Sequence, residues 1–160
     1  MYTRILVPTD GSEVSALAER AAIDFARANG SALVALAVGQ PYPPATAGEG
    51  TMVIDPVAET EALQAWATRQ AARVAEAAEA AGLACTPVTA IAYAPADAIV
   101  EHAQRYDCDL IFMGSHGRHG LSRLLAGSVT QDVLAAATVP VMVLRPQPRQ
   151  LKAPSGRTGG

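Results

Sequence analysis

Short apolar runs alternate with longer stretches of helical periodicity along most of this chain. Two parallel strands need a long crossover, usually a helix, so this alternation is typical of a parallel α/β sheet. Glycine and proline mark most of the boundaries. The pattern predicts five strands, at 4–8, 32–38, 85–92, 109–113 and 140–144, and four helices, at 14–29, 57–81, from 95 onwards and at 128–137.

Two of the predicted strands contain a proline with a positional meaning. Pro8 is expected to end the first strand, and Pro87 to restrict the third to an edge or a bulge, because proline cannot donate to a ladder. The helix that begins at Pro95 is expected to turn Ile99, Val100 and Ala103 inward.

Length and composition indicate one folded domain. The chain has 160 residues, of which 50% are hydrophobic, enough for a single core. We expect this domain to cover 1–145 and the segment 146–160, rich in proline and glycine, to be disordered. A net charge of −3 argues against a general nucleic-acid binder or a basic membrane-surface protein.

Cysteine content and hydropathy point to the cytoplasm. Cys85 and Cys108 are the only cysteines, too few for a disulfide framework, and we interpret both as buried, inert thiols. The sequence shows neither a signal-peptide pattern nor an apolar stretch long enough to span a membrane. We therefore expect a cytoplasmic protein without a membrane partner.

Two strand ends carry unusual residues, at 8–12 and at 113–128. Ligands of open parallel sheets bind beyond the carboxyl ends of the strands, where the strand order reverses. Gly127 and Ser128 lie where the last helix should begin, so free N–H groups and the helix dipole would face an anion there. The segment 111–130 contains no carboxylate but includes Arg118 and Arg123, which suits phosphates. The alternative is a solvated strand-to-helix connection without a ligand.

Other phosphate-binding motifs do not fit. A P-loop needs a lysine beside its serine or threonine, and the only lysine is Lys152 in the tail. A dinucleotide fingerprint needs several glycines after the first strand, where only Gly11 occurs.

The spacing Gly114-x2-Gly117-x9-Gly127-Ser128 resembles the ATP-binding signature of the universal stress proteins. The resemblance extends to 5–12, 95–99 and 139–144, and so covers 3–145. Two departures are modest. Ala94 replaces an expected glycine, and Ser115 an expected threonine.

This resemblance implies a doubly wound sheet of order 3-2-1-4-5, the adenine nucleotide alpha hydrolase-like fold. It also implies ATP as the ligand, with Mg²⁺ bridging the phosphates, and a homodimer formed through the strand Val139 to Leu144. The residues expected around adenine, ribose and phosphates are Pro8, Thr9, Asp10, Val38, Met113, Gly114, Gly117, Arg118, Gly127, Ser128 and Val129.

Several residues have competing interpretations. Asp10 either caps the first helix or forms an Asx turn, in addition to any ligand contact. Ser128 is compatible with an N-cap and with phosphate binding. His116 and His119 lack a third metal ligand nearby, so we expect solvated histidines and no protein metal site.

Three functional hypotheses follow. The first is a sensor, in which bound ATP orders the loops 39–56 and 114–128 and changes the surface offered to a partner that the sequence does not identify. The second is a slow ATPase or autophosphorylating protein, disfavoured because no lysine and no water-activating base is evident near the glycines. The third is a dimeric interaction module that binds no nucleotide.

Overall fold

A computed structural model describes residues 1–41, 55–115 and 128–145 of the chain. Most of the predicted loop at 39–56, the middle of the glycine signature at 116–127 and the tail at 146–160 lie outside these described residues. The predictions made for those three segments therefore stay predictions.

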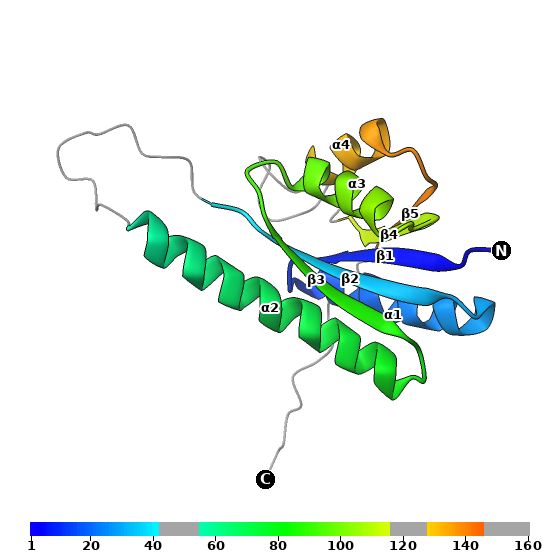
Figure 1. Ribbon diagram of the computed structural model, residues 1–160. Coiled ribbons are helices and arrows are strands. Elements are labelled where there is room, and N and C mark those ends of the chain that lie inside the picture. The colour runs from blue at the N-terminus through cyan, green and yellow to red at the C-terminus, as the bar shows by residue number, and fades with distance from the viewer. Residues whose placement is uncertain (42–54, 116–127, 146–160) are drawn as a thin grey trace, which may run out of the picture.

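The described residues form one five-stranded parallel sheet of order β3-β2-β1-β4-β5 (Figure 1). This confirms the predicted order and all five strands, each to within one residue at either end. The strands are β1 (Arg4–Thr9), β2 (Ala32–Gly39), β3 (Cys85–Ile91), β4 (Leu110–Gly114) and β5 (Val141–Leu144).

The four predicted helices are also confirmed. Ser12 caps the first by accepting the N–H of Ser15, and Gly30 ends it with a φ of 69°, which glycine tolerates without strain. The helices are α1 (Glu13–Asn29), α2 (Pro56–Ala80), α3 (Pro95–Arg105) and α4 (Ser128–Ala136).

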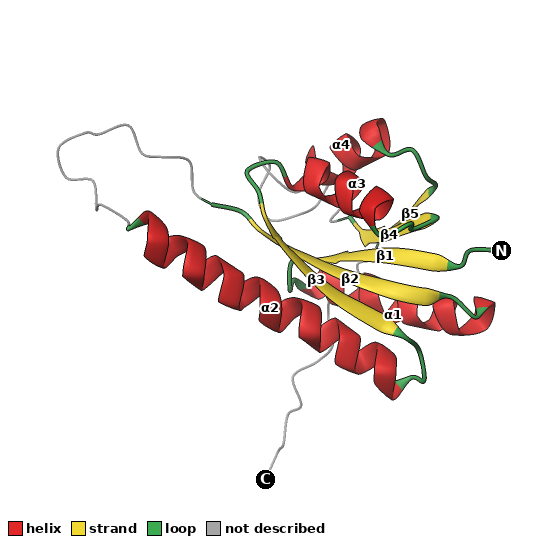
Figure 2. Ribbon diagram, in the orientation of Figure 1, coloured by secondary structure: helices red, strands yellow, loops and turns green. Residues whose placement is uncertain are grey.

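Helices cover both faces of the sheet: α1 and α2 one face, α3 and α4 the other (Figure 2). Alternate residues of each strand therefore enter different cores. Leu6 and Ile111 pack with Ile99 and Val133 on the α3/α4 side. Ile5 and Val7 pack on the α1/α2 side. Within the described residues, no helix is long and apolar enough to cross a membrane.

The predictions made for the two strand prolines fare differently. β3 is an edge strand, so the interpretation of Pro87 is confirmed. Pro8 does not end β1, which pairs with β2 as far as Thr9. The pairing of β1 with β4 joins only Ile5 to Leu110 and Leu6 to Ile111 among the described residues. β1 and β4 thus part before their carboxyl ends, and Pro8, without an N–H, lies where they part.

Two burial predictions need correction. Val100 is only half-buried, while Ile99 and Ala103 of the same helix are buried as predicted. Cys108 is buried, but Cys85 is half-buried because it begins the edge strand β3.

Candidate functional site

A cavity of about 280 Å³ opens at the carboxyl ends of the strands. It lies at the topological switch point, because β1 and β4 are adjacent in the sheet but carry crossovers on opposite faces. Its walls come from the ends of β1, β2 and β4 and from the starts of α1, α3 and α4. The lining residues are Pro8, Thr9, Asp10, Ser12, Ser15, Leu36, Val38, Gln40, Pro95, Ile99, Met113, Gly114, Val129 and Thr130.

Residues predicted from distant parts of the sequence meet in this cavity. Those that line it are Pro8, Thr9, Asp10, Val38, Met113, Gly114 and Val129. Ser128 begins α4, as predicted. The positions Gly117, Arg118 and Gly127 lie outside the described residues.

Asp10 forms the Asx turn and is not the helix cap. Its Oδ1 accepts the N–H of Ser12 at 2.9 Å, while the Ser12 hydroxyl oxygen accepts the N–H of Ser15 at 3.1 Å and caps α1. Of the two local roles expected for Asp10, the structure therefore shows the Asx turn, because Ser12 directly precedes the helix and caps it. The carboxylate of Asp10 stays exposed beside the cavity.

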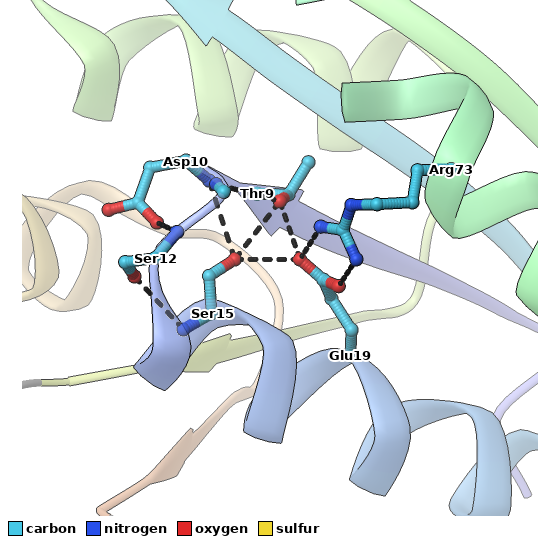
Figure 3. Close-up of polar contacts among 7 residues, drawn as sticks. Thr9, Asp10, Ser12, Ser15, Glu19 and Arg73 are labelled. Atoms are coloured by element: carbon cyan, nitrogen blue, oxygen red, sulfur yellow. Dashed lines mark hydrogen bonds and ion pairs between the residues drawn. The ribbon is translucent and has the colours of Figure 1, made fainter. Parts of the chain in front are cut away.

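Beneath this turn lies a buried polar network that the sequence analysis missed (Figure 3). Glu19 of α1 has a side chain only 4% exposed, and its Oε1 accepts hydrogen bonds from the hydroxyls of Thr9 at 2.5 Å and Ser15 at 2.8 Å. Arg73 reaches across from α2 and donates through Nη1 to Oε2 at 2.9 Å and through Nη2 to Oε1 at 3.0 Å. This two-point geometry is the strong form of an arginine–carboxylate pair.

Glu19 had a detectable sequence signal. Val14, Ser15, Ala18, Glu19 and Ala22 are all buried and recur at helical spacing. A glutamate on the apolar stripe of a helix is rarely buried without a partner. The partner itself, Arg73, could not be identified from the sequence because nothing in the pattern of α2 distinguishes it from Arg69.

Gly114 lies at the cavity wall and also allows close helix packing. A Cβ at this position would lie 2.9 Å from both Val14 Cγ1 and the Val14 carbonyl oxygen. Gly114 therefore lets α1 approach the end of β4, a role independent of any ligand.

Gly11 brings α2 against the same turn. Its φ is 74°, and a Cβ there would lie 2.8 Å from Gln70 Oε1. Gln70 and Arg73 are three residues apart on α2, so one side of that helix brings Gln70 against the turn and Arg73 against Glu19 beneath it.

Metal-binding groups are sparse near the cavity. Over the described ranges, no group of three or more His, Cys, Asp or Glu side chains lies in an arrangement that could hold a metal ion. Asp10 is the one acidic residue among the described residues that line the cavity.

A sequence model described as the universal stress protein family matches residues 1–145. The chain belongs to the universal stress protein family. Universal stress protein MJ0531 of Methanocaldococcus jannaschii is 33% identical over 146 residues, which cover 91% of this chain and 83% of that protein. YxiE of Bacillus subtilis is 29% identical and is covered over its whole length.

Solved structures of universal stress proteins share the fold. The structure of MJ0577 of Methanocaldococcus jannaschii has a TM-score of 0.68 and 26% identity, covering 92% of this chain and 98% of that one. A universal stress protein in complex with cAMP has a TM-score of 0.66 and 25% identity, covering 91% and 98%.

Proposed function

We propose that this universal stress protein is a cytoplasmic protein that binds ATP in the switch-point cavity as a regulatory ligand. The observation that carries the proposal is the cavity itself, which gathers residues from six elements at the place where parallel α/β sheets bind ligands. A related protein of the same fold, solved in complex with cAMP, supports an adenine nucleotide as the ligand class.

The chemistry of the walls suits a nucleoside. Pro8, Val38, Ile99 and Met113 offer apolar surface to a purine ring. The carboxylate of Asp10 is an acceptor suited to ribose hydroxyl donors. The base would lie between the ends of β1 and β2 and the end of β4, with the ribose against the β1–α1 turn.

The start of α4 suits the phosphates. Val129, in its first turn, lines the cavity, and the first turn of a helix directs free N–H groups and a partial positive charge outward. We assign the phosphates to this end, together with the signature residues Gly117, Arg118, Gly127 and Ser128. Mg²⁺ would be held chiefly by phosphate oxygens, because such sites usually need only one or two carboxylates and Asp10 is the acid at hand.

The first test is calorimetric titration of the purified protein with ATP, ADP and cAMP in the presence of Mg²⁺. We expect ATP binding, an approximately tenfold weaker affinity in Asp10→Asn, and no detectable binding in Gly127→Glu, which would add a negative charge beside the phosphates. Asp132→Asn is the matched control: it makes the same substitution on an exposed residue of α4 that does not line the cavity.

Wild-type protein that binds none of the three nucleotides would refute the proposal. Binding that survives both Asp10→Asn and Gly127→Glu would move the ligand out of this cavity. A regulatory role further requires that saturating ATP slows amide exchange outside the cavity walls, and unchanged exchange there would refute it.

A homodimer through β5 is a second proposal, favoured by the position of that strand. β5 is an edge strand, and Met142 on it is 37% exposed. Pro140 and Leu144 direct their carbonyl oxygens to β4, where they accept the N–H groups of Ile111 and Ser115. Backbone groups alternate along a strand, so those of Val141 and Val143 point to the open edge.

Val143→Pro removes one outward N–H and leaves the pairing with β4 in place. We expect it to shift a dimer to monomer in sedimentation equilibrium, while Thr138→Pro, which lies before the strand, leaves the dimer intact. A wild-type monomer at all concentrations would contradict this proposal without bearing on ATP binding.

A further inference from the structure

Glu19 lies under the cavity without lining it, yet two of its hydrogen-bond partners, Thr9 and Ser15, do line it. The connection therefore runs from a buried charge, through two hydroxyls, to the wall of the site. Figure 3 shows these side chains converging on one carboxylate oxygen beneath the turn.

The number of hydrogens fixes the direction of these bonds. Each hydroxyl has one hydrogen to donate and lone pairs that accept, whereas an ionised carboxylate only accepts. Thr9 and Ser15 therefore both donate to Glu19, and their oxygens are left to accept. Thr9 Oγ1 lies 3.3 Å from the nitrogen of Gly11, and Ser15 Oγ lies 3.4 Å from the nitrogen of Asp10.

The bonds reach the backbone of the turn that carries Asp10. Without the carboxylate, the Ser15 hydrogen would turn toward Thr9 Oγ1, which lies only 3.0 Å away. The Thr9 hydrogen would then lose its acceptor, and the two hydroxyls would no longer present the same lone pairs to the turn. The charge of Glu19 thus selects one arrangement of the turn.

Arg73 keeps that charge in place. Its side chain is 46% exposed and its guanidinium binds both oxygens of Glu19, so the almost fully buried carboxylate has a charged partner. Gln70, one turn earlier on α2, lies against Gly11. The turn is therefore held from below by Glu19 and from the side by α2.

We propose that Glu19 is a positioning residue for nucleotide binding, which sets the β1–α1 turn through Thr9 and Ser15, and that Arg73 makes this setting depend on α2. The inference rests on the proposed nucleotide function. It adds that affinity depends on a charge pair that contacts no part of the ligand.

The deciding variant is Glu19→Leu with Arg73→Met, which removes both charges but preserves much of the packing. Replacing a buried ion pair by apolar residues of similar size is often neutral for stability. A purely structural pair would therefore leave the site unchanged in this variant. Asp24→Leu with Arg27→Met is the matched control, since it makes the same substitutions in the exposed pair of α1, whose atoms lie 3.3 Å apart.

Two measurements are made on the full chain: amide exchange of Asp10 and Gly11 without ligand, and the Kd for ATP with Mg²⁺. In the Glu19→Leu/Arg73→Met variant we expect both the exchange rates and the Kd to rise about tenfold, and in the control neither to change. Wild-type values of either quantity in a folded variant would overturn the inference. If the double variant does not fold, Glu19→Gln, which keeps the length of the side chain, is judged by the same two measurements.

The two proposals fail in different ways. Wild-type protein with no affinity for ATP refutes the proposed function, and the exchange rates of Asp10 and Gly11 alone then decide whether Glu19 sets the turn. Wild-type protein that binds ATP, together with a variant that binds equally well, refutes the positioning role alone.

Discussion

The two ends of β1 are each held by an acidic side chain, but in opposite ways. At the amino end, Asp109 accepts directly from the N–H and hydroxyl of Thr3 at 2.7 and 2.8 Å and from the N–H of Arg4 at 3.1 Å. At the carboxyl end, Glu19 reaches the turn only through the hydroxyls of Thr9 and Ser15.

This difference follows the sheet itself. At the amino end β1 and β4 are paired, and the Asp109 N–H donates to the Arg4 carbonyl oxygen, so a side chain can join the two strands directly. At the carboxyl end the strands have parted and a cavity lies between them. One end is closed by bonds between strands, whereas the other opens into the cavity and has a buried polar network beneath its turn. The predictions below test that contrast.

The largest effect should follow from removing the partner of the buried charge. Arg73→Ala leaves Glu19 buried and unpaired, so we expect a loss of about 3 kcal/mol in the free energy of unfolding. Arg69→Ala, on the exposed side of the same helix, should change it by less than about 0.5 kcal/mol. Chemical denaturation measures both. Equal losses in the two variants would show that the network adds no stability at the open end.

Gly114→Ala tests how closely α1 approaches the open end. The new Cβ would lie 2.9 Å from two atoms of Val14, one of them a backbone oxygen that cannot turn aside. We expect a loss of about 2 kcal/mol by chemical denaturation. Gly30→Ala is the comparison, because its Cβ meets nothing within 4 Å and only the φ of 69° opposes it. It should cost about 1 kcal/mol. A smaller loss at Gly114 than at Gly30 would mean that the helix moves away freely.

What the sequence could predict differs between the elements of the fold and the network beneath the open end. Strands and helices follow from apolar periodicity and from the crossover that parallel strands require, so their bounds were predictable to within a residue. The sheet order was predicted only through the resemblance to the universal stress proteins, because periodicity does not say which strands pair. The ends of β1 and β4 could be predicted as a candidate site because glycine and polar residues interrupt the pattern there, whereas Val38 at the end of β2 was predicted only through the family resemblance. Glu19 and Arg73 were not predicted as a pair, since 54 residues separate them and only the packing of α2 beside α1 brings them together.

Pro8 shows how a local rule can mislead. Proline lacks a donor, which suggests the end of a strand, but a strand needs donors only where a neighbour accepts them. β1 still pairs with β2 beyond Pro8, but its pairing with β4 has ended before that residue. The residue that was expected to stop the strand therefore lies where the cavity opens.

A smaller, pH-dependent effect is expected at the closed end. Burial tends to raise the pKa of Asp109, but the hydrogen bonds from Thr3 and Arg4 outweigh it and hold this pKa below its ordinary value. The stabilisation is therefore complete above the pKa of the unfolded aspartate, about 3.9, and is lost as pH falls through the lower folded value. Because the carboxylate is near solvent, we expect Asp109→Asn to cost less than about 1 kcal/mol at pH 7.

The difference between wild type and Asp109→Asn should shrink as the pH of the denaturation experiment falls from 7 to about 2. A difference that grows in acid would contradict the lowered pKa. Asp107→Asn, two residues earlier and exposed, is the matched control and should follow the wild-type pH profile.

The smallest effect concerns the two thiols, which both lie at the closed end. Cys85 begins β3 and Cys108 precedes β4, and burial raises the pKa of each thiol to about 11. At neutral pH each therefore holds roughly three hundredfold less thiolate than a free cysteine with a pKa of about 8.5. We expect slow labelling by iodoacetamide that accelerates with pH. Neither cysteine lines the cavity, so saturating ATP should leave both rates unchanged. Protection of either thiol by ATP would show that ligand binding at the open end changes the structure at the closed end, so that the two ends are not independent.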